Sequence, residues 1–260
     1  MNKDNRNSRT FKKHVLLSHS MRILLAKNSK KFFVKDISAD FHCQFGFVTS
    51  ADLKKKPGST VKTNKGVELK IIEPSFIDLY ARIKRGPQIV APKDIASIIV
   101  ETGIGKESVV VDAGGGSGAL CFYLAHICKK VTTYELREDF TKILEANKKF
   151  LGLKNITIKN KDVCDGIAEK AVDIITLDLS EPWKAITEAE KALKPGGFLV
   201  SYSPTIPQVA DFIQALNKTE FIHIKTKEIL ERLWECEERK IRPFTHMLAH
   251  TGFLTFCRRL

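Results

Sequence analysis

The residues best suited to hold a ligand form a glycine-rich run, Asp112-Ala113-Gly114-Gly115-Gly116-Ser117-Gly118. The run follows a predicted apolar strand and precedes a predicted helix. Glycine lets the chain turn sharply and lets a ligand approach the backbone closely, and open α/β sheets bind ligands at the carboxyl ends of their strands. Taken alone the run is a weak signal, because a dinucleotide-binding loop has a similar composition.

Two acids and a turn follow the glycine-rich run in order. Glu135 ends the next predicted strand, where its carboxylate can accept hydrogen bonds from both hydroxyls of a ribose. Asp162 follows the third predicted strand, where it could meet an adenine amino group. Lys194-Pro195-Gly196-Gly197-Phe198 makes a tight turn into the fifth strand. Either acid alone is most simply a surface residue, but together with the run they indicate a nucleoside-binding site.

This order of loop, acids and turn resembles the class I methyltransferases. The resemblance implies S-adenosylmethionine as the cofactor. A nicotinamide-dependent enzyme fits less well, because it rarely needs the turn and usually ends its sheet with a parallel strand. The cofactor contacts implied by the resemblance are Gln88, Gly114, Gly116, Ser117, Gly118, Ala119, Glu135, Arg137, Asp162, Val163 and Asp178.

A second group of residues with chemical potential begins at Asp178. The apolar segment from Val172 to Leu177 predicts a strand that delivers Asp178-Leu179-Ser180-Glu181-Pro182-Trp183 to the edge that carries the glycine-rich run. We therefore expect Asp178 beside the cofactor pocket, where a methyl acceptor must lie. The alternative is that Asp178 caps the following helix and that Pro182 and Trp183 only pack.

At this motif the chain resembles the TrmI-type tRNA (adenine-N1)-methyltransferases, whose acceptor-side motif reads Asp-x-x-Glu/Asp-Pro-Trp. The resemblance covers about residues 15 to 260. It implies methylation of adenine N1 in the T-loop of tRNA, at position 58 and sometimes 57, by a homotetramer. The other similar segments are Lys56 to Pro74, Arg85 to Asp94, Arg242-Pro243 and His250 to Leu254.

The expected chemistry depends on Asp178 as the catalytic residue. Adenine N1 is a modest nucleophile, and Asp178 would accept a hydrogen bond from the exocyclic amino group, which raises the electron density at N1. The target base must first flip out of the folded T-loop. Tyr202 could stack on the base or be a core tyrosine. His250 and Thr251 are expected to border the acceptor pocket, with a buried, hydrogen-bonded His250 as the alternative.

The chain departs from the family pattern at two places. Ala91 stands where the family usually carries an aromatic residue or histidine near the target base, and the segment from Phe41 to Gly46 lacks the family's more basic version. The departure at Ala91 leaves the methylated position open. It also leaves open the alternative that the chain is a non-catalytic tRNA-binding subunit. The presence of Asp178 and Glu135 favours a catalytic protein instead. The other alternative is a small-molecule methyltransferase, for instance one acting on a corrinoid precursor.

The framework that must position these residues is an alternating α/β domain. We expect a flexible basic tail over residues 1–13, a β-rich domain over residues 14–85 and a Rossmann-like, seven-stranded methyltransferase domain over residues 86–260. The first two strands of the β-rich domain are expected at Arg22 to Leu25 and Lys31 to Val34, followed by Phe45 to Val48, Ser59 to Thr63 and Glu68 to Ile72. Two final strands, Ile229 to Glu235 and Thr251 to Cys257, are expected to form an antiparallel hairpin at the sheet edge.

The amino-acid composition indicates which kind of partner the chain binds. The chain carries 43 Lys and Arg against 30 Asp and Glu, a formal net charge of +13, which favours a polyanion such as tRNA. Its six cysteines form no C-x-x-C pair and no zinc-ligand spacing, so we expect reduced thiols and no metal, with a disulfide as the exception in a thermophile. Without a membrane-spanning run or a secretory signal, a cytoplasmic protein is expected.

Overall fold

The computed structural model describes residues 21–86 and 88–260, and the chain divides into two compact units, Met1–Arg82 and Ile83–Leu260. The basic tail predicted over residues 1–13 lies outside the described residues. The sequence predicted a domain boundary after Arg85, whereas the structure divides after Arg82. Among the described residues, no helix is long and apolar enough to cross a membrane.

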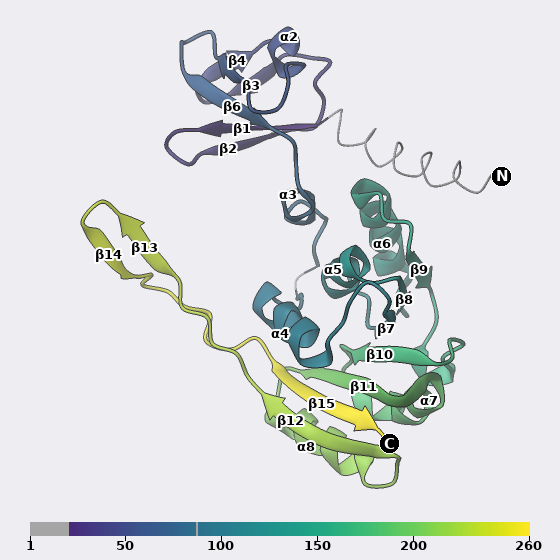
Figure 1. Ribbon diagram of the computed structural model, residues 1–260. Coiled ribbons are helices and arrows are strands. Elements are labelled where there is room, and N and C mark those ends of the chain that lie inside the picture. The colour runs from purple at the N-terminus through teal and green to yellow at the C-terminus, as the bar shows by residue number, and fades with distance from the viewer. Residues whose placement is uncertain (1–20, 87) are drawn as a thin grey trace, which may run out of the picture. The chain divides into compact units, whose positions relative to one another are not determined.

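The first unit contains a four-stranded antiparallel sheet with the strand order β2-β1-β6-β5 (Figure 1). Its elements are β1 (Arg22–Ala26), β2 (Lys31–Val34), β3 (Phe41–Cys43), β4 (Gly46–Val48), α2 (Ser50–Leu53), β5 (Thr60–Lys62), β6 (Glu68–Ile72) and α3 (Phe76–Tyr80). A small core, with Leu24, Leu53 and Ile71 fully buried, holds the unit together. The hairpin predicted at Asn64-Lys65-Gly66 joins β5 to β6, whereas the β3–β4 pair extends the single strand that the sequence predicted there.

The second unit is built on a seven-stranded sheet with the order β12-β15-β11-β10-β7-β8-β9, which confirms the predicted fold class. β7 to β11, without the helices between them, run parallel, and β15 runs antiparallel to both of its neighbours, β11 and β12. The elements up to β10 are α4 (Pro92–Thr102), β7 (Val109–Ala113), α5 (Ala119–Ile127), β8 (Lys130–Tyr134), α6 (Glu138–Leu151), β9 (Ile156–Lys159), the 3₁₀ turn η1 (Val163–Asp165) and β10 (Val172–Leu177). They are followed by η2 (Pro182–Ala185), α7 (Ile186–Ala192), β11 (Leu193–Ser203), α8 (Ile206–Leu216), β12 (Phe221–Lys227), β13 (Trp234–Glu237), β14 (Lys240–Pro243) and β15 (Phe253–Arg259).

The apolar strands form the centre of this sheet because helices cover them. α5 packs on β7, β8 and β9, and α8 packs on β11, β12 and β15. Val111, Ile175 and Leu199, on three neighbouring strands, are fully buried in one core cluster. The chain order reverses between β7 and β10, which lie side by side in the sheet. Ligands bind at such a reversal, outside the carboxyl ends of the strands.

The prediction of a hairpin at the sheet edge is wrong for its first strand, Ile229 to Glu235. β15 pairs with β12, not with a strand over Ile229 to Glu235, and helix α8, which the sequence did not predict, precedes β12. The physical reason is that β12 is an edge strand in which only Phe221 is buried, so its sequence carries little hydrophobic signal. Trp234–Glu237 pairs instead with Lys240–Pro243 in a separate two-stranded ribbon (Figure 1).

Candidate active site

The glycine-rich run forms the turn between β7 and α5. Gly114 has a φ of +87°, and a Cβ built there would lie 2.0 Å from the Asp178 carbonyl oxygen. The Asp178 amide donates to the Ala113 carbonyl at 2.8 Å, so the ends of β7 and β10 are in direct contact. Gly118 is equally constrained, since a Cβ would lie 1.9 Å from the Phe122 ring. Gly114 therefore lets the loop meet the Asp178 segment, and Gly118 lets the loop pack against the first turn of α5.

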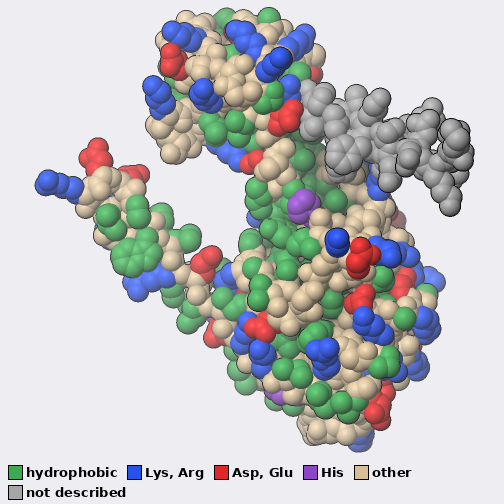
Figure 2. Space-filling view, in the orientation of Figure 1, with side chains coloured by type: hydrophobic (Ala, Val, Ile, Leu, Met, Phe, Trp, Pro, Cys, Tyr) green, Lys and Arg blue, Asp and Glu red, His purple; other side chains and the backbone are tan. Residues whose placement is uncertain are grey.

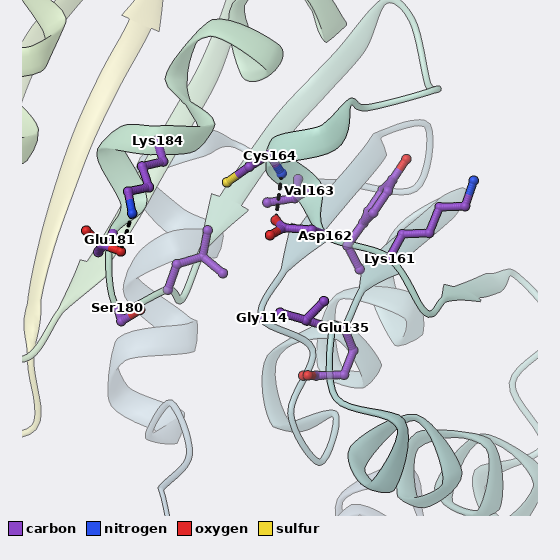
Figure 3. A pocket seen from close by; sticks show the side chains of 12 residues that line it. Gly114, Glu135, Lys161, Asp162, Val163, Cys164, Ser180, Glu181 and Lys184 are labelled. Carbon is purple, nitrogen blue, oxygen red and sulfur yellow. Dashed lines mark hydrogen bonds and ion pairs between the residues drawn. The ribbon is translucent and has the colours of Figure 1, made fainter.

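A pocket of about 300 Å³ opens at the carboxyl ends of β7, β8, β9 and β10. These are the two strands at the chain reversal, β7 and β10, and the next two strands on one side of the sheet, β8 and β9. In Figure 3 the Glu181–Lys184 ion pair lies on one side of the pocket, and Asp162 and Glu135 lie on the other. The pocket is lined by Gly114, Tyr134, Glu135, Leu136, Lys161, Asp162, Val163, Cys164, Leu179, Ser180, Glu181 and Lys184.

Glu135 is held by the backbone. Its Oε2 accepts a hydrogen bond from the Gly116 amide at 2.7 Å, and its Oε1 accepts one from the Arg137 amide at 2.8 Å. Each carboxylate oxygen keeps a further lone pair for a ligand hydroxyl. The side chain of Arg137 points elsewhere: its guanidinium pairs with Asp139 and lies 4.1 Å from the centre of the Phe140 ring. Glu135 is thus oriented before any ligand binds.

Asp162 begins the η1 turn and lines the pocket on the same side as Glu135 (Figure 3). Its Oδ1 accepts a hydrogen bond from the Cys164 amide at 2.8 Å, which leaves Oδ2 for a ligand (Figure 3). Lys161 and Val163, on either side of Asp162, also line the pocket. The short turn therefore presents several consecutive residues to the same space.

The glycine-rich loop also contains a polar atom with no partner. Ser117 is 3% exposed, and its Oγ makes no hydrogen bond to any of the described residues. The loop backbone is fixed behind it, because Asn147 donates to the Ser117 carbonyl at 2.9 Å. A Cβ at Gly116 would meet only the Gly114 carbonyl oxygen, at 3.8 Å. An orphaned buried hydroxyl beside open space fits a polar ligand seated against the loop.

Three carboxylates lie close together at this end of the sheet. Burial first, and then the negative charges of Asp112 and Glu135, together raise the pKa of Asp178 to about 7. Burial likewise raises the pKa of Asp112 to about 6, although the hydroxyls of Thr176 and Thr133 donate to it at 2.7 and 2.9 Å. Such a cluster creates a negative potential that favours a cationic ligand.

The acceptor-side residues named by the sequence lie on two segments. Tyr202, on β11, is 3% exposed, and its hydroxyl donates to the Thr251 carbonyl at 2.6 Å; burial raises the pKa of Tyr202 to about 12. His250 is exposed and faces Glu228 through Nδ1 at 2.5 Å and the Pro204 carbonyl through Nε2 at 2.7 Å. The hydrogen bonds to these two acceptors raise the pKa of His250, and the bond to Glu228 has the larger effect.

The structure brings some of the predicted residues together and not others. Of the predicted cofactor contacts, four line the pocket: Gly114, Glu135, Asp162 and Val163. Gly116, Ser117, Gly118 and Ala119 form the adjoining loop and the start of α5, and Asp178 lies directly before the lining residue Leu179. Gln88 is exposed in the segment before α4, and Ala91 is the N-cap of that helix. Sequence reasoning missed five lining residues. Tyr134, Leu136 and Lys161 lie at or just after the carboxyl end of a parallel strand, and Cys164 and Lys184 lie in the 3₁₀ turns η1 and η2.

The chain resembles known tRNA methyltransferases in sequence. The family model for the tRNA methyltransferase complex GCD14 subunit matches residues 79–242. The chain is 35% identical to a tRNA (adenine(57)-N(1)/adenine(58)-N(1))-methyltransferase TrmI of Methanocaldococcus jannaschii, over 91% of this chain and 94% of the relative.

Two solved structures are similar over nearly the whole chain. A SAM-dependent O-methyltransferase from Thermotoga maritima has a TM-score of 0.83 and 32% identity, covering 100% of this chain and 98% of that chain. The tRNA (m1A58) methyltransferase TrmI from Aquifex aeolicus has a TM-score of 0.78 and 26% identity, covering 94% of this chain and 98% of that chain. The chain therefore belongs to the tRNA methyltransferase complex GCD14 subunit family, together with the TrmI enzymes.

Proposed function

We propose that this protein uses S-adenosylmethionine to methylate N1 of an adenine in the T-loop of tRNA, at position 58, with or without position 57. The observation that carries the proposal is the meeting of Asp178 with the glycine-rich loop and Glu135 at the carboxyl ends of β7, β8 and β10. The named activities of the TrmI relatives support the same substrate.

The pocket residues fit S-adenosylmethionine. Glu135 would bind the ribose hydroxyls, Asp162 and Val163 the adenine, and Ser117 and the loop backbone the polar remainder. Gly116, Gly118 and Ala119 shape this loop, and Gln88 and Arg137 are proposed contacts that do not line the pocket. When bound, the cofactor supplies a methyl group already activated by its sulfonium. The neighbouring carboxylates favour that positive charge.

Asp178 is the proposed catalytic residue. Its carboxylate would accept a hydrogen bond from the exocyclic amino group of the adenine and so increase the electron density at N1. A pKa of about 7 leaves the group largely ionised in mildly alkaline solution and basic enough to take up a proton released by the methylated base. Tyr202 would form one wall for the base beside Asp178, and His250 and Thr251 would border the same side.

The charge distribution supports tRNA as the partner. Residues 21–82 carry twelve Lys or Arg and six Asp or Glu, and the whole chain has a formal net charge of +13. Lys and Arg side chains are spread over the face of the first unit that is visible in Figure 2. Basic surfaces bind phosphates by releasing counterions, so we expect tRNA affinity to fall steeply with salt. We further propose a cytoplasmic enzyme, as its tRNA-modifying relatives suggest.

We also propose that the enzyme assembles as a homotetramer, and the β13–β14 ribbon supports this. Exposed apolar side chains gather on it and its flanks (Figure 2), namely Leu230, Leu233, Trp234, Ile241, Phe244, Met247 and Leu248. Residues 228–248 contain five Glu against four Lys or Arg, so in a chain of net charge +13 this segment suits a protein partner better than a polyanion.

Sedimentation would test the assembly. Replacing Trp234 and Ile241 together by serine should yield smaller species, because their burial against another copy is lost. Val100→Ser is the matched control, since Val100 is 79% exposed on a helix away from the ribbon. An unchanged sedimentation coefficient in the double variant would contradict the assembly proposal.

The proposed activity is tested by methyl transfer from labelled S-adenosylmethionine to an unmodified tRNA transcript. The wild type should incorporate label, and Asp178→Ala should lose about 100-fold or more of the rate, the usual contribution of a positioned acid or base. A wild type that binds tRNA but incorporates nothing would favour a non-catalytic subunit. Incorporation into a small molecule but not into tRNA would favour the corrinoid-type alternative, and equal rates of the two proteins would overturn the role of Asp178.

A further inference from the structure

A buried polar triangle joins the start of α4 to the segment before β15. Asp94 is 0% exposed and accepts hydrogen bonds from Lys93 Nζ at 2.8 Å and from Thr251 Oγ1 at 2.7 Å. Lys93 Nζ also donates to Thr251 Oγ1 at 2.6 Å. Each of the three side chains therefore contacts the other two. Removing charged groups from water is costly, and a fully satisfied buried network fixes its members rigidly in return.

The same segment fixes Tyr202 from two directions. The Thr251 carbonyl accepts the hydrogen bond from the Tyr202 hydroxyl at 2.6 Å. Gly252 lies against the ring, because a Cβ built there would be 2.5 Å from the Tyr202 Cζ atom. The position of the tyrosine ring and of its hydroxyl thus depends on where residues 251 and 252 are held.

Tyr202 is also the neighbour of Asp178 across the sheet. β10 and β11 run parallel, and Leu177 is paired with Ser201. The next residues are Asp178, which directly follows β10, and Tyr202 on β11, so the strand register places them side by side. Hydrogen bonds therefore lead from Lys93 and Asp94 through Thr251 to Tyr202, which lies beside the strand end that Asp178 follows.

We propose that Lys93, Asp94 and Thr251 are positioning residues that hold Tyr202 at a fixed place beside Asp178 and so set the geometry of the acceptor side. They act through Tyr202 and do not touch the substrate. The inference rests on the proposed function for its kinetic consequence, but not for its structural one. It assigns Thr251 a role through its contacts with Asp94 and Tyr202, not as a direct contact of the base.

A matched pair of variants at Thr251 tests the proposal. Thr251→Val keeps the shape of the side chain but removes both hydrogen bonds to the triangle, whereas Thr251→Ser keeps the hydroxyl. Thr251→Val should lower kcat at saturating tRNA by about 10-fold, since misplacements of about 1 Å can cost up to about 100-fold. Its affinity for S-adenosylmethionine, measured by calorimetry, should stay within about twofold, and Thr251→Ser should restore kcat.

A double-mutant cycle asks whether the effect passes through Tyr202. Tyr202→Phe removes the hydroxyl that the Thr251 carbonyl binds, so adding Thr251→Val to it should lower kcat by less than about twofold further. A loss in that background as large as in the wild type would overturn the proposal. A wild-type kcat in Thr251→Val would overturn it as well.

A spectroscopic measurement separates this inference from the proposed function. The chain has four tyrosines, so ring-labelled tyrosine gives a simple NMR spectrum in which Tyr202→Phe identifies one resonance. That resonance should move in Thr251→Val and in Gly252→Ala, which crowds the ring directly, and should stay in place in Thr251→Ser. An unmoved resonance in both altered proteins would overturn the positioning role. A wild type without methyltransferase activity would instead overturn the proposed function.

Discussion

The two sides of the site are held by different kinds of interaction. On the cofactor side, backbone groups position the side chains. The Gly116 and Arg137 amides bind the Glu135 carboxylate, and Gly114 allows the Asp178 backbone to approach the loop. On the acceptor side, the contacts are between side chains and loops that lie far apart in the chain, such as Asp94 and Thr251.

This difference shows which functions each side can support. A site made from strand ends and a tight turn keeps its shape as long as the fold is intact, which suits a ligand shared by many enzymes. A site made from a few distant side chains can change with single substitutions. Ala91, at the N-cap of α4 two residues before Lys93, is the position at which we propose such a change. Changes on the two sides should therefore have separable effects.

The largest expected effect comes from closing the contact at Gly114. Gly114→Ala would place a Cβ 2.0 Å from the Asp178 carbonyl oxygen at a φ of +87°, so the loop must move. We expect affinity for S-adenosylmethionine, measured by calorimetry, to fall by more than about 100-fold, with about 1–3 kcal/mol of lost stability. Gly105→Ala is the control, because its Cβ meets nothing nearer than 4.0 Å. Wild-type affinity in Gly114→Ala would contradict the tight contact.

A smaller loss confined to the cofactor side is expected for Glu135→Gln. The neutral amide is a weaker acceptor for the Gly116 and Arg137 amides and for ribose hydroxyls, so affinity should fall about 10- to 100-fold, as for the loss of a charged hydrogen bond. The rate at saturating cofactor should change little. Glu138→Gln, on an exposed carboxylate in the same segment, is the matched control. An equal loss of cofactor affinity in Glu135→Gln and Glu138→Gln would contradict the role proposed for Glu135.

The pH dependence of methyl transfer should report on Asp178. The ionised carboxylate accepts the hydrogen bond from the adenine amino group much more strongly than the protonated acid does, so a pKa of about 7 makes the rate fall as the pH is lowered. Between about pH 8 and about pH 6 the decrease should be about 10-fold. Asp112, with a pKa of about 6, also becomes neutral as the pH falls, and because its charge raises the pKa of Asp178, its protonation should soften the fall at lower pH. A flat rate across this range would contradict the role of Asp178.

The smallest effect is one of stability, and its sign is opposite to that at Gly114. The folded-state pKa of Asp178 is raised, so the folded protein binds a proton more tightly than the unfolded chain, and the ionised group opposes folding above about pH 7. Asp178→Asn should therefore raise the free energy of unfolding at about pH 8, by on the order of 1–3 kcal/mol. The gain should shrink as the pH is lowered from about 7 towards about 4, as denaturant titration would show. A less stable variant at alkaline pH would contradict this account.

The contrast between the two sides also explains what the sequence could predict. The apolar strands from β7 to β11 and the glycine-rich turn were predictable, because a parallel sheet buried on both faces leaves continuous hydrophobic segments. The partner of β15 was not, because β12 buries only Phe221 and the more apolar segment around Trp234 is exposed. The contact between Asp94 and Thr251 spans 157 positions in the chain, and no local pattern in one sequence signals it.

Identification of the methylated nucleoside tests the central claim most directly. An unmodified tRNA transcript is incubated with the wild-type enzyme and S-adenosylmethionine, and its nucleosides and nuclease fragments are analysed by mass spectrometry. The account predicts N1-methyladenosine in the T-loop fragment, at position 58 with or without position 57. A methyl group on a ribose oxygen, on a different base or on no nucleoside at all would contradict it.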